Sequence, residues 1–189
     1  MRRSAVSLCF GGAFLTTIVL ASVAGGRAQD RDDEGDGRIQ QGFRIAPVPL
    51  NLRGKNRALV GLGSYIVNAQ GVCADCHSCP TYEPGHNPYV GGDGKFNATN
   101  YLAGGVHFGP FTSANLTPDN HGVPEQGNDF ATFMTMMRTG HDPDEGNRIL
   151  QVMPWPVYRH MTDRDLRAIY EYLRAIPTAR PGLCAGPGE

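Results

Sequence analysis

The chain has 189 residues and a formal net charge of −1, from 17 lysine and arginine and 18 aspartate and glutamate side chains. No basic patch stands out in the sequence, which argues against a nucleic-acid partner. The length suits one domain with its own hydrophobic core.

Residues 1–28 are predicted to be a secretory signal peptide. Arg2 and Arg3 precede an apolar stretch over residues 5–24, and small residues follow it. This order is typical of a leader that is cleaved, here after Ala24 or Ala28. About 20 apolar residues can also cross a bilayer, so an uncleaved anchor is the alternative. Cleavage predicts an exported, periplasmic protein with a net charge of about −4. Membrane association would then require an uncleaved N-terminus or a partner.

Residues 29–55 are expected to form a flexible segment ahead of the fold. Residues 30–41 are rich in charge and glycine and poor in apolar side chains, a composition typical of disordered chain. Pro47 and Pro49 indicate an extended approach to the domain. The segment can be a tether or a terminus without a function of its own.

The first predicted helix spans about residues 57–69. Its apolar side chains recur at helical spacing. They are Leu59, Leu62, Ile66 and Ala69. Gly61 and Gly63 weaken the helix propensity, but the absence of side chains there would let another helix approach closely.

Residues 73–77 read Cys-Ala-Asp-Cys-His, which is the C-x-x-C-H signature of covalent haem attachment. Because the two thiols are three residues apart, one helical turn puts them on the same side of the backbone. There they can form thioethers with the two vinyl groups of one haem. His77 follows at once and can bind the iron as the proximal ligand. The motif therefore predicts one haem c, bound through Cys73 and Cys76.

A zinc site and a thiol redox pair are the rival interpretations of this motif. Zinc sites usually take ligand pairs from two separated loops, whereas Cys73, Cys76, His77 and Cys79 fall within seven residues. A thioredoxin-like pair needs a βαβ context, and no strand pattern precedes this one. Both rivals are therefore disfavoured.

No convincing helix is predicted between His77 and Asn128. This stretch is rich in glycine, proline and asparagine. So long an irregular segment usually carries a function or a ligand, and a haem is an apolar body around which loops can pack. Short strands near Val90 and over residues 106–108 are weaker expectations.

The second predicted helix begins near Asn128, a favourable N-cap, and ends at Gly140. Its apolar residues follow the i, i+3, i+4, i+7 pattern. They are Phe130, Phe133, Met134 and Met137. This spacing indicates core packing for the two methionines rather than iron ligation.

The third predicted helix begins at Thr162, which together with Asp165 resembles a capping box, and it ends before Pro177. Its inward stripe consists of Leu166, Ile169, Tyr170 and Leu173. We expect this face to pack across the first helix at its glycines.

Met153 is the best candidate for the second iron ligand. It lies in a loop stiffened by Pro154 and Pro156. Thioether ligation raises the reduction potential relative to two histidines, and it fills the sixth position of the iron. The alternative ligands are Met161, His107, His121, His141 and His160.

Several motifs occur in a fixed order along the chain. They are GSYIVNA (63–69) leading to CADCH (73–77), NLTPD (115–119), Phe130 with MRTG (137–140), MPWPVY (153–158) and DLRAIYEYL (165–173). In these motifs the chain resembles the class I c-type cytochromes. It is similar to the one-haem domains in the cytochrome subunits of bacterial membrane-bound alcohol and sugar dehydrogenases. The resemblance covers residues 56–178, and residues 179–189 form a tail.

The resemblance implies an all-α cytochrome c fold. In this fold the N- and C-terminal helices cross, one covalent haem fills the cleft, and the loops are long and irregular. It also implies His77 and Met153 as the axial ligands. Asn115 and Trp155 would contact the haem edge or the propionates, or serve in packing alone.

The resemblance further implies one-electron transfer, without making or breaking substrate bonds, between redox partners outside the cytoplasm. Such partners are a dehydrogenase or a component of a respiratory chain, so the chain itself would be no enzyme. It could diffuse freely or be a haem subunit of a larger complex. The main alternative is a haem enzyme whose open sixth iron site acts on a small ligand.

Two features depart from those dehydrogenase subunits. The subunits carry three haem domains, whereas this chain has one C-x-x-C-H motif and no internal repeat. Cys79 and Cys184 also lie outside the motif. With Cys9 lost in the cleaved leader, an even remainder of cysteines is left, and in an oxidising compartment this suggests a disulfide, which would tie the C-terminal tail beside the haem loop.

Overall fold

The computed structural model describes residues 37–124, 127–143 and 145–184. The helical elements are residues 37–45, α2 (Arg57–Tyr65), the π-helical turn η1 (Ile66–Gln70), α3 (Cys73–His77), the 3₁₀ turn η2 (Pro88–Val90), α4 (Phe130–Thr139), α5 (Trp155–Tyr158) and α6 (Asp163–Leu173). Two short hairpins complete the described chain. One pairs β1 (His107–Phe108) with β2 (Phe111–Thr112), and the other pairs β3 (His141–Asp142) with β4 (Arg148–Ile149). The helix-rich architecture is compatible with the predicted cytochrome c fold.

The predicted leader, residues 1–28, lies outside the described residues, as do residues 29–36 and 185–189. Within the described ranges, no helix combines the length and the apolarity needed to cross a bilayer.

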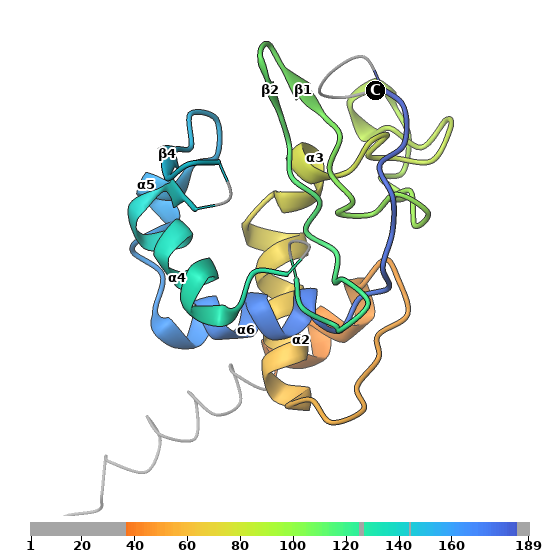
Figure 1. Ribbon diagram of the computed structural model, residues 1–189. Helices are drawn as coiled ribbons and strands as arrows, with labels where there is room; N and C mark the ends of the chain where they lie inside the picture. The colour runs from red at the N-terminus through yellow and green to blue at the C-terminus, as the bar shows by residue number, and fades with distance from the viewer. Residues whose placement is uncertain (1–36, 125–126, 144, 185–189) are drawn as a thin grey trace, which may run out of the picture.

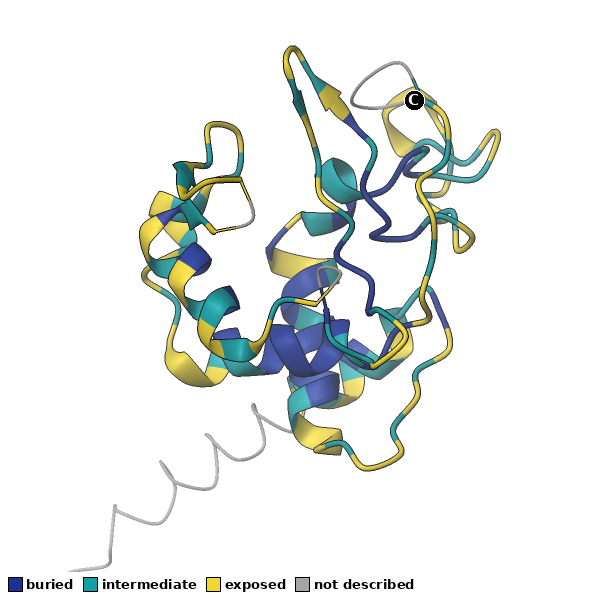
Figure 2. Ribbon diagram, in the orientation of Figure 1, coloured by how far each residue is buried: buried dark blue, intermediate teal, exposed yellow. Residues whose placement is uncertain are grey.

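Helices α2 and α6 cross at the base of the molecule as drawn in Figure 1, and the buried residues gather at this crossing (Figure 2). Gly63 makes the close approach possible, because a Cβ at this position would overlap the carbonyl oxygen of Ala168. From α6, Leu166 and Leu173 are almost completely buried. The prediction that the third helix packs on the glycines of the first is therefore confirmed at Gly63.

Residues 37–45 form a helix, so the predicted flexible segment is wrong for this stretch. Gly42 lies directly against Gly61 of α2, where a Cβ on either residue would clash. Ser64 donates a hydrogen bond to the Gly42 carbonyl at 2.7 Å. The charged composition of residues 30–41 concealed an apolar pair, Ile39 and Phe43, spaced one turn apart and packed against the core.

The first predicted helix is α-helical only to Tyr65 and then widens into η1. The Gly71 N–H donates to the Ile66 carbonyl at 2.7 Å, which is an i to i+5 bond. Single π turns of this kind occur often at functional sites. Here the wider turn leads the chain into the C-x-x-C-H motif.

Helix α4 begins one residue later than predicted. Asp129 rather than Asn128 is the N-cap, and its carboxylate accepts a hydrogen bond from the Thr132 N–H at 2.9 Å. Gly140 ends the helix with a φ of +73°, as predicted. The buried face consists of Phe133, Met136 and Met137. Met134, which was predicted to be buried, is half-buried on the flank of this face.

Helix α6 begins as predicted. The Thr162 hydroxyl accepts from the Asp165 N–H at 3.1 Å, and the Asp165 carboxylate accepts from the Thr162 N–H at 3.2 Å. This reciprocal pair is a capping box with Asp in the third position.

The stretch between α3 and α4 is mostly irregular, as predicted. The expected strand at Val90 is instead part of the 3₁₀ turn η2, whereas the expected strand over residues 106–108 is present as β1. The predicted disulfide joins Cys79 to Cys184, with a Cα–Cα distance of 5.7 Å. It ties the end of the described chain to the loop that follows α3.

Candidate functional site

A cavity of about 470 Å³ is lined by residues of α3, the β1–β2 hairpin, α4 and α5. Its lining is largely apolar and includes Ile66, Val67, Phe133, Met137, Ile169 and Leu173. A mostly apolar cavity of a few hundred Å³ with a few polar groups is typical of a cofactor or small-molecule site.

The structure brings five of the six predicted site residues to this cavity. Cys73, Cys76, His77, Asn115 and Met153 all line it, although they are spread over 80 residues of sequence. Trp155, the sixth, is absent from the lining.

Helix α3 presents the two thiols. Cys73 and Cys76 are free cysteines of intermediate exposure. Burial, and to a lesser extent the neighbouring Cys76, raises the pKa of Cys73 to about 12. Burial also raises the pKa of Cys76, with a further contribution from Asp75. Both thiols are therefore neutral at pH 7, unlike the low-pKa thiolate of a redox-active pair.

The ring of His77 is oriented by one backbone contact. Its Nδ1 lies 2.8 Å from the carbonyl oxygen of Ala114. Because a carbonyl can only accept, Nδ1 carries the proton and Nε2 keeps the lone pair that a metal ion binds. Burial lowers the pKa of His77, and the bond to Ala114 opposes this effect. The ring is thus held neutral in the tautomer that a metal ligand requires.

Met153 lines the cavity from the loop between β4 and α5. Among the alternative ligands, Met161 also lines the cavity, whereas the four histidines do not. Two of these histidines use Nδ1 elsewhere, His107 with the Thr112 hydroxyl and His141 with the Asn147 carbonyl. Of the ligands considered from the sequence, Met153 and Met161 therefore line the cavity, beside Met136 and Met137 from the buried face of α4.

Trp155 packs against the end of α4 and is absent from the cavity lining. Its ring covers Gly140, where an added Cβ would overlap the indole, and its Nε1 donates to the Leu150 carbonyl at 3.2 Å. Trp155 thereby fixes the end of α4 to the loop that carries Met153. Gly140 is needed both for its positive φ and for the space that the indole occupies.

Asn115 borders the cavity, but its amide is already engaged. Its Nδ2 donates to the Ala179 carbonyl at 2.9 Å, and its Oδ1 accepts from the Thr117 N–H at 2.9 Å. The amide nitrogen of Asn115 thus binds the C-terminal tail, and its oxygen binds Thr117.

Tyr158 of α5 was not predicted as a site residue. It lines the cavity, and its hydroxyl donates to the Gly71 carbonyl at 2.6 Å. Burial and the nearby thiols raise the pKa of Tyr158 to about 12, so the hydroxyl remains a donor at neutral pH. The acceptor is a backbone carbonyl, which sequence patterns do not identify.

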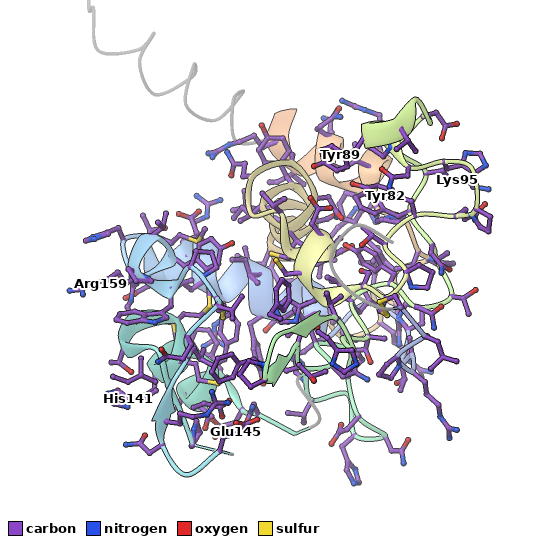
Figure 3. All side chains as sticks on the ribbon, turned by 90° about the horizontal axis from the view of Figure 1, so that it is seen from above. Tyr82, Tyr89, Lys95, His141, Glu145 and Arg159 are labelled. Atoms are coloured by element: carbon purple, nitrogen blue, oxygen red, sulfur yellow. A yellow bond between two sulfur atoms is a disulfide. The ribbon has the colours of Figure 1, made fainter. Side chains whose placement is uncertain are left out.

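The charged residues of the lining lie on the β3–β4 hairpin. They are Asp142, Glu145 and Arg148. Arg148 is the only lysine or arginine among the described residues that line the cavity. Its guanidinium pairs with Glu145 and lies 5.0 Å from the centre of the Phe111 ring. Glu145 and His141 lie on one side of the molecule and Tyr89 and Lys95 on the other, as seen from above in Figure 3. No sequence signal distinguished Arg148 from the other arginines.

Among the described residues the structure shows no set of ligands for a zinc ion. Cys79 is held in the disulfide. Across the described ranges, no three His, Cys, Asp or Glu side chains converge as a metal site would require.

Comparison with known proteins shows similarity to components of bacterial dehydrogenases. A component of the nicotinate dehydrogenase of Pseudomonas putida is 35% identical over 140 residues, which cover 72% of this chain and 10% of that protein. The gluconate 2-dehydrogenase cytochrome c subunit of Pantoea cypripedii is 32% identical over 118 residues, covering 62% and 23%. The cytochrome c subunit of the quinone alcohol dehydrogenase of Gluconobacter oxydans is 29% identical over 153 residues, covering 78% and 31%.

These matches confirm the resemblance to cytochrome subunits of bacterial dehydrogenases. The chain spans between about a tenth and a third of the length of these relatives. No family profile matches the chain. No solved structure matches it significantly.

Proposed function

We propose that this chain is a one-haem c-type cytochrome that transfers single electrons between redox partners outside the cytoplasm. The observation that carries the proposal is the arrangement of the C-x-x-C-H motif. Its two thiols and the oriented ring of His77 line an apolar cavity, and Met153 lines the same cavity from the other half of the chain.

The residues present fit a haem c. Cys73 and Cys76 supply thiols for the two thioethers, Nε2 of His77 is available to the iron, and Met153 offers a thioether for the sixth position. When bound, the haem supplies an iron that cycles between Fe(III) and Fe(II) by gaining or losing one electron. The apolar lining would exclude water from it.

Arg148 would serve the two carboxylates that a haem carries. An apolar cavity offers such groups little stabilisation. The guanidinium of Arg148 is the basic group of the described lining, and beside its pair with Glu145 it has further N–H donors for a carboxylate. Asn115 contributes less to this task, because its amide already binds the tail.

Export from the cytoplasm is supported by the disulfide. Structural disulfides persist in oxidising compartments such as the bacterial periplasm and are rare in the cytosol. Cys79 is fully buried and bonded to Cys184. The predicted leader agrees with this placement.

The relatives favour electron transfer over catalysis. Two of them are named as cytochrome c subunits of dehydrogenases. We therefore propose a dehydrogenase component or a respiratory-chain component as the partner, and no enzymatic activity of the chain itself. The haem enzyme with an open sixth site remains the alternative function that the experiment addresses.

The test is the absorption spectrum and reduction potential of the exported, purified protein, with Met153→Ala and Met161→Ala as a matched pair. We expect the wild type to show a covalent haem and the weak long-wavelength band of thioether-ligated Fe(III). Met153→Ala should lose this band and lower the potential, whereas Met161→Ala should do neither. An unchanged Met153→Ala protein would exclude Met153 as the ligand. A wild type that lacks the band and binds cyanide rapidly would favour the enzyme.

A further inference from the structure

The C-terminal strap, residues 177–184, runs beside the loop that follows α3 (Figure 1). Asn100 donates to the Arg180 carbonyl at 2.8 Å, and the Thr178 hydroxyl donates to the Pro118 carbonyl at 2.8 Å. The strap ends at Cys184, whose disulfide partner Cys79 lies two residues after His77. One end of the strap is therefore fixed two residues after His77, and the other end is fixed to Pro118.

The middle of the strap is bound by the segment that orients the His77 ring. Ala114 accepts the hydrogen bond from Nδ1 of His77, and Asn115 follows it in the chain. The Asn115 amide donates to the Ala179 carbonyl, and its Oδ1 accepts from the Thr117 hydroxyl at 2.7 Å. The same hydroxyl accepts from the Ala179 N–H at 3.1 Å. One connected set of bonds thus runs from the strap to the residue beside Ala114.

The backbone of His77 is also held by Gly104 and Gly105, which lie against Ala114 and the strap. The Gly104 N–H donates to the His77 carbonyl at 2.7 Å, and Gly104 lies so close to Ala114 that a Cβ would overlap its carbonyl. Gly105 faces Pro181 of the strap, and an added Cβ there would lie 2.8 Å from the proline Cβ. Movement of the strap would therefore disturb the hydrogen bonds of His77 to Ala114 and to Gly104.

We propose that the strap, acting through Asn115 and Thr117, positions the Ala114 carbonyl that orients the His77 ring, and that the Cys79–Cys184 disulfide locks it. This inference rests on the proposed function, because it treats His77 as the iron ligand. Asn115 and Thr117 are positioning residues. A partner that accepts a hydrogen bond from the second ring nitrogen makes a ligating histidine a stronger electron donor. A stronger donor favours Fe(III), so a loosened strap should raise the reduction potential.

The experiment compares four variants of the full-length haem protein. Thr117→Val removes the hydroxyl that joins Asn115 to Ala179, and Thr117→Ser restores it. Cys184→Ser removes the disulfide that holds the end of the strap. Thr178→Val is the matched control, because it removes a strap hydroxyl that bonds to Pro118 and leaves the bonds of Asn115 and Thr117 to Ala179 in place. Reduction potential and unfolding midpoint are measured for each protein.

We expect Thr117→Val and Cys184→Ser to raise the potential, Thr117→Ser to return it toward the wild-type value, and Thr178→Val to lower only the unfolding midpoint. Unchanged potentials in Thr117→Val and Cys184→Ser, with lower unfolding midpoints, would overturn the positioning role and leave the proposed function intact. A wild type without His-ligated haem would overturn both. If Thr117→Val does not fold, Cys184→Ser against wild type decides the question by the same two measurements.

Discussion

Val72, the residue before the first thiol, carries an unusual backbone conformation. Its φ is +53°, in the left-handed region, and its side chain is 61% exposed. A β-branched residue rarely adopts this region, which costs an ordinary L-residue roughly 1–2 kcal/mol. The strain lies where the chain turns from η1 into α3 and so presents the thiols to the cavity. Such strain is often found at functional sites.

Val72→Asn should relieve this strain, because asparagine tolerates the left-handed region and little packing is lost. We expect the free energy of unfolding to rise by about 1 kcal/mol in denaturant titration. Val90→Asn is the control, since Val90 is 82% exposed in a 3₁₀ turn and is not among the residues with positive φ. Equal effects of the two substitutions would show that the conformation of Val72 is not strained.

Arg148 permits a test of the proposed carboxylate contact. A positive charge beside a haem favours the reduced iron, so Arg148→Gln should lower the reduction potential and make it less sensitive to ionic strength. Arg159→Gln is the matched control, because Arg159 is an exposed arginine at the end of α5 and is absent from the cavity lining (Figure 3). Potentials that agree between Arg148→Gln and wild type would contradict a contact between Arg148 and the haem carboxylates.

At the scale of elements, the crossing of α2 and α6 depends on Gly63. Gly63→Ala should force the helices apart, since the new Cβ would overlap the Ala168 carbonyl. Overpacking of this kind costs about 1–3 kcal/mol. Gly37→Ala has open space around the added Cβ and should leave the free energy of unfolding unchanged or slightly raised. Chemical denaturation of both variants measures the difference. A Gly63→Ala protein as stable as Gly37→Ala would mean that the crossing is not close-packed at this residue.

The N-cap of α4 makes part of the stability depend on pH. The hydrogen bond from the Thr132 backbone, together with the Thr132 side chain, lowers the pKa of Asp129. A lowered pKa contributes stability above the unfolded value of about 3.9, and this contribution is lost as pH falls through the folded value. Asp129→Asn keeps a capping oxygen but does not titrate. We therefore expect unfolding midpoints close to wild type at pH 7 and a shallower loss of stability below about pH 4. Identical acid profiles would refute this assignment.

Helix boundaries were predictable from sequence where residues close in the sequence determine them. Thr162 and Asp165 lie three residues apart, and Gly140 ends α4 through its own backbone freedom. The helix over residues 37–45 was missed because its cause is distant. Gly42 is helical against Gly61, and the apolar pair Ile39 and Phe43 is too short a pattern to predict the helix by itself. The widening of α2 into η1 was missed because the apolar spacing of the sequence continues through the π turn to Ala69, which is exposed in the structure.

At the scale of the whole molecule, the candidate site was predictable as a set of side chains but not as a set of contacts. Cys73, His77 and Met153 are distinguished by residue type and motif, and the structure brings them to one cavity. Their supports are mostly backbone carbonyls, such as Ala114 for His77. Every residue has a carbonyl, so sequence cannot indicate which one is used. Tertiary packing alone selects it.

One hydrogen bond beside the cavity joins α5 to the turn before the thiols. The Tyr158 hydroxyl donates to the Gly71 carbonyl, joining residues that are 87 positions apart. It connects α5, next to the Met153 loop, with the turn before the thiols. Gly71 is buried, so its carbonyl would lack this partner in Tyr158→Phe. Leaving a buried acceptor unsatisfied costs about 1–3 kcal/mol.

Tyr158→Phe should therefore lower the free energy of unfolding by about 1–3 kcal/mol. It should also loosen the Met153 side of the cavity, so that cyanide or imidazole displaces the sixth ligand of the ferric protein faster than in wild type. Tyr89→Phe is the matched control, because Tyr89 is 75% exposed and its hydroxyl lies 3.5 Å from Asp75, outside the cavity. Denaturant titration measures the first effect and stopped-flow absorbance the second. If Tyr158→Phe loses stability but exchanges ligand at the wild-type rate, the bond supports the fold without restraining the Met153 loop. If it changes neither, the bond contributes neither to stability nor to the restraint of the Met153 loop.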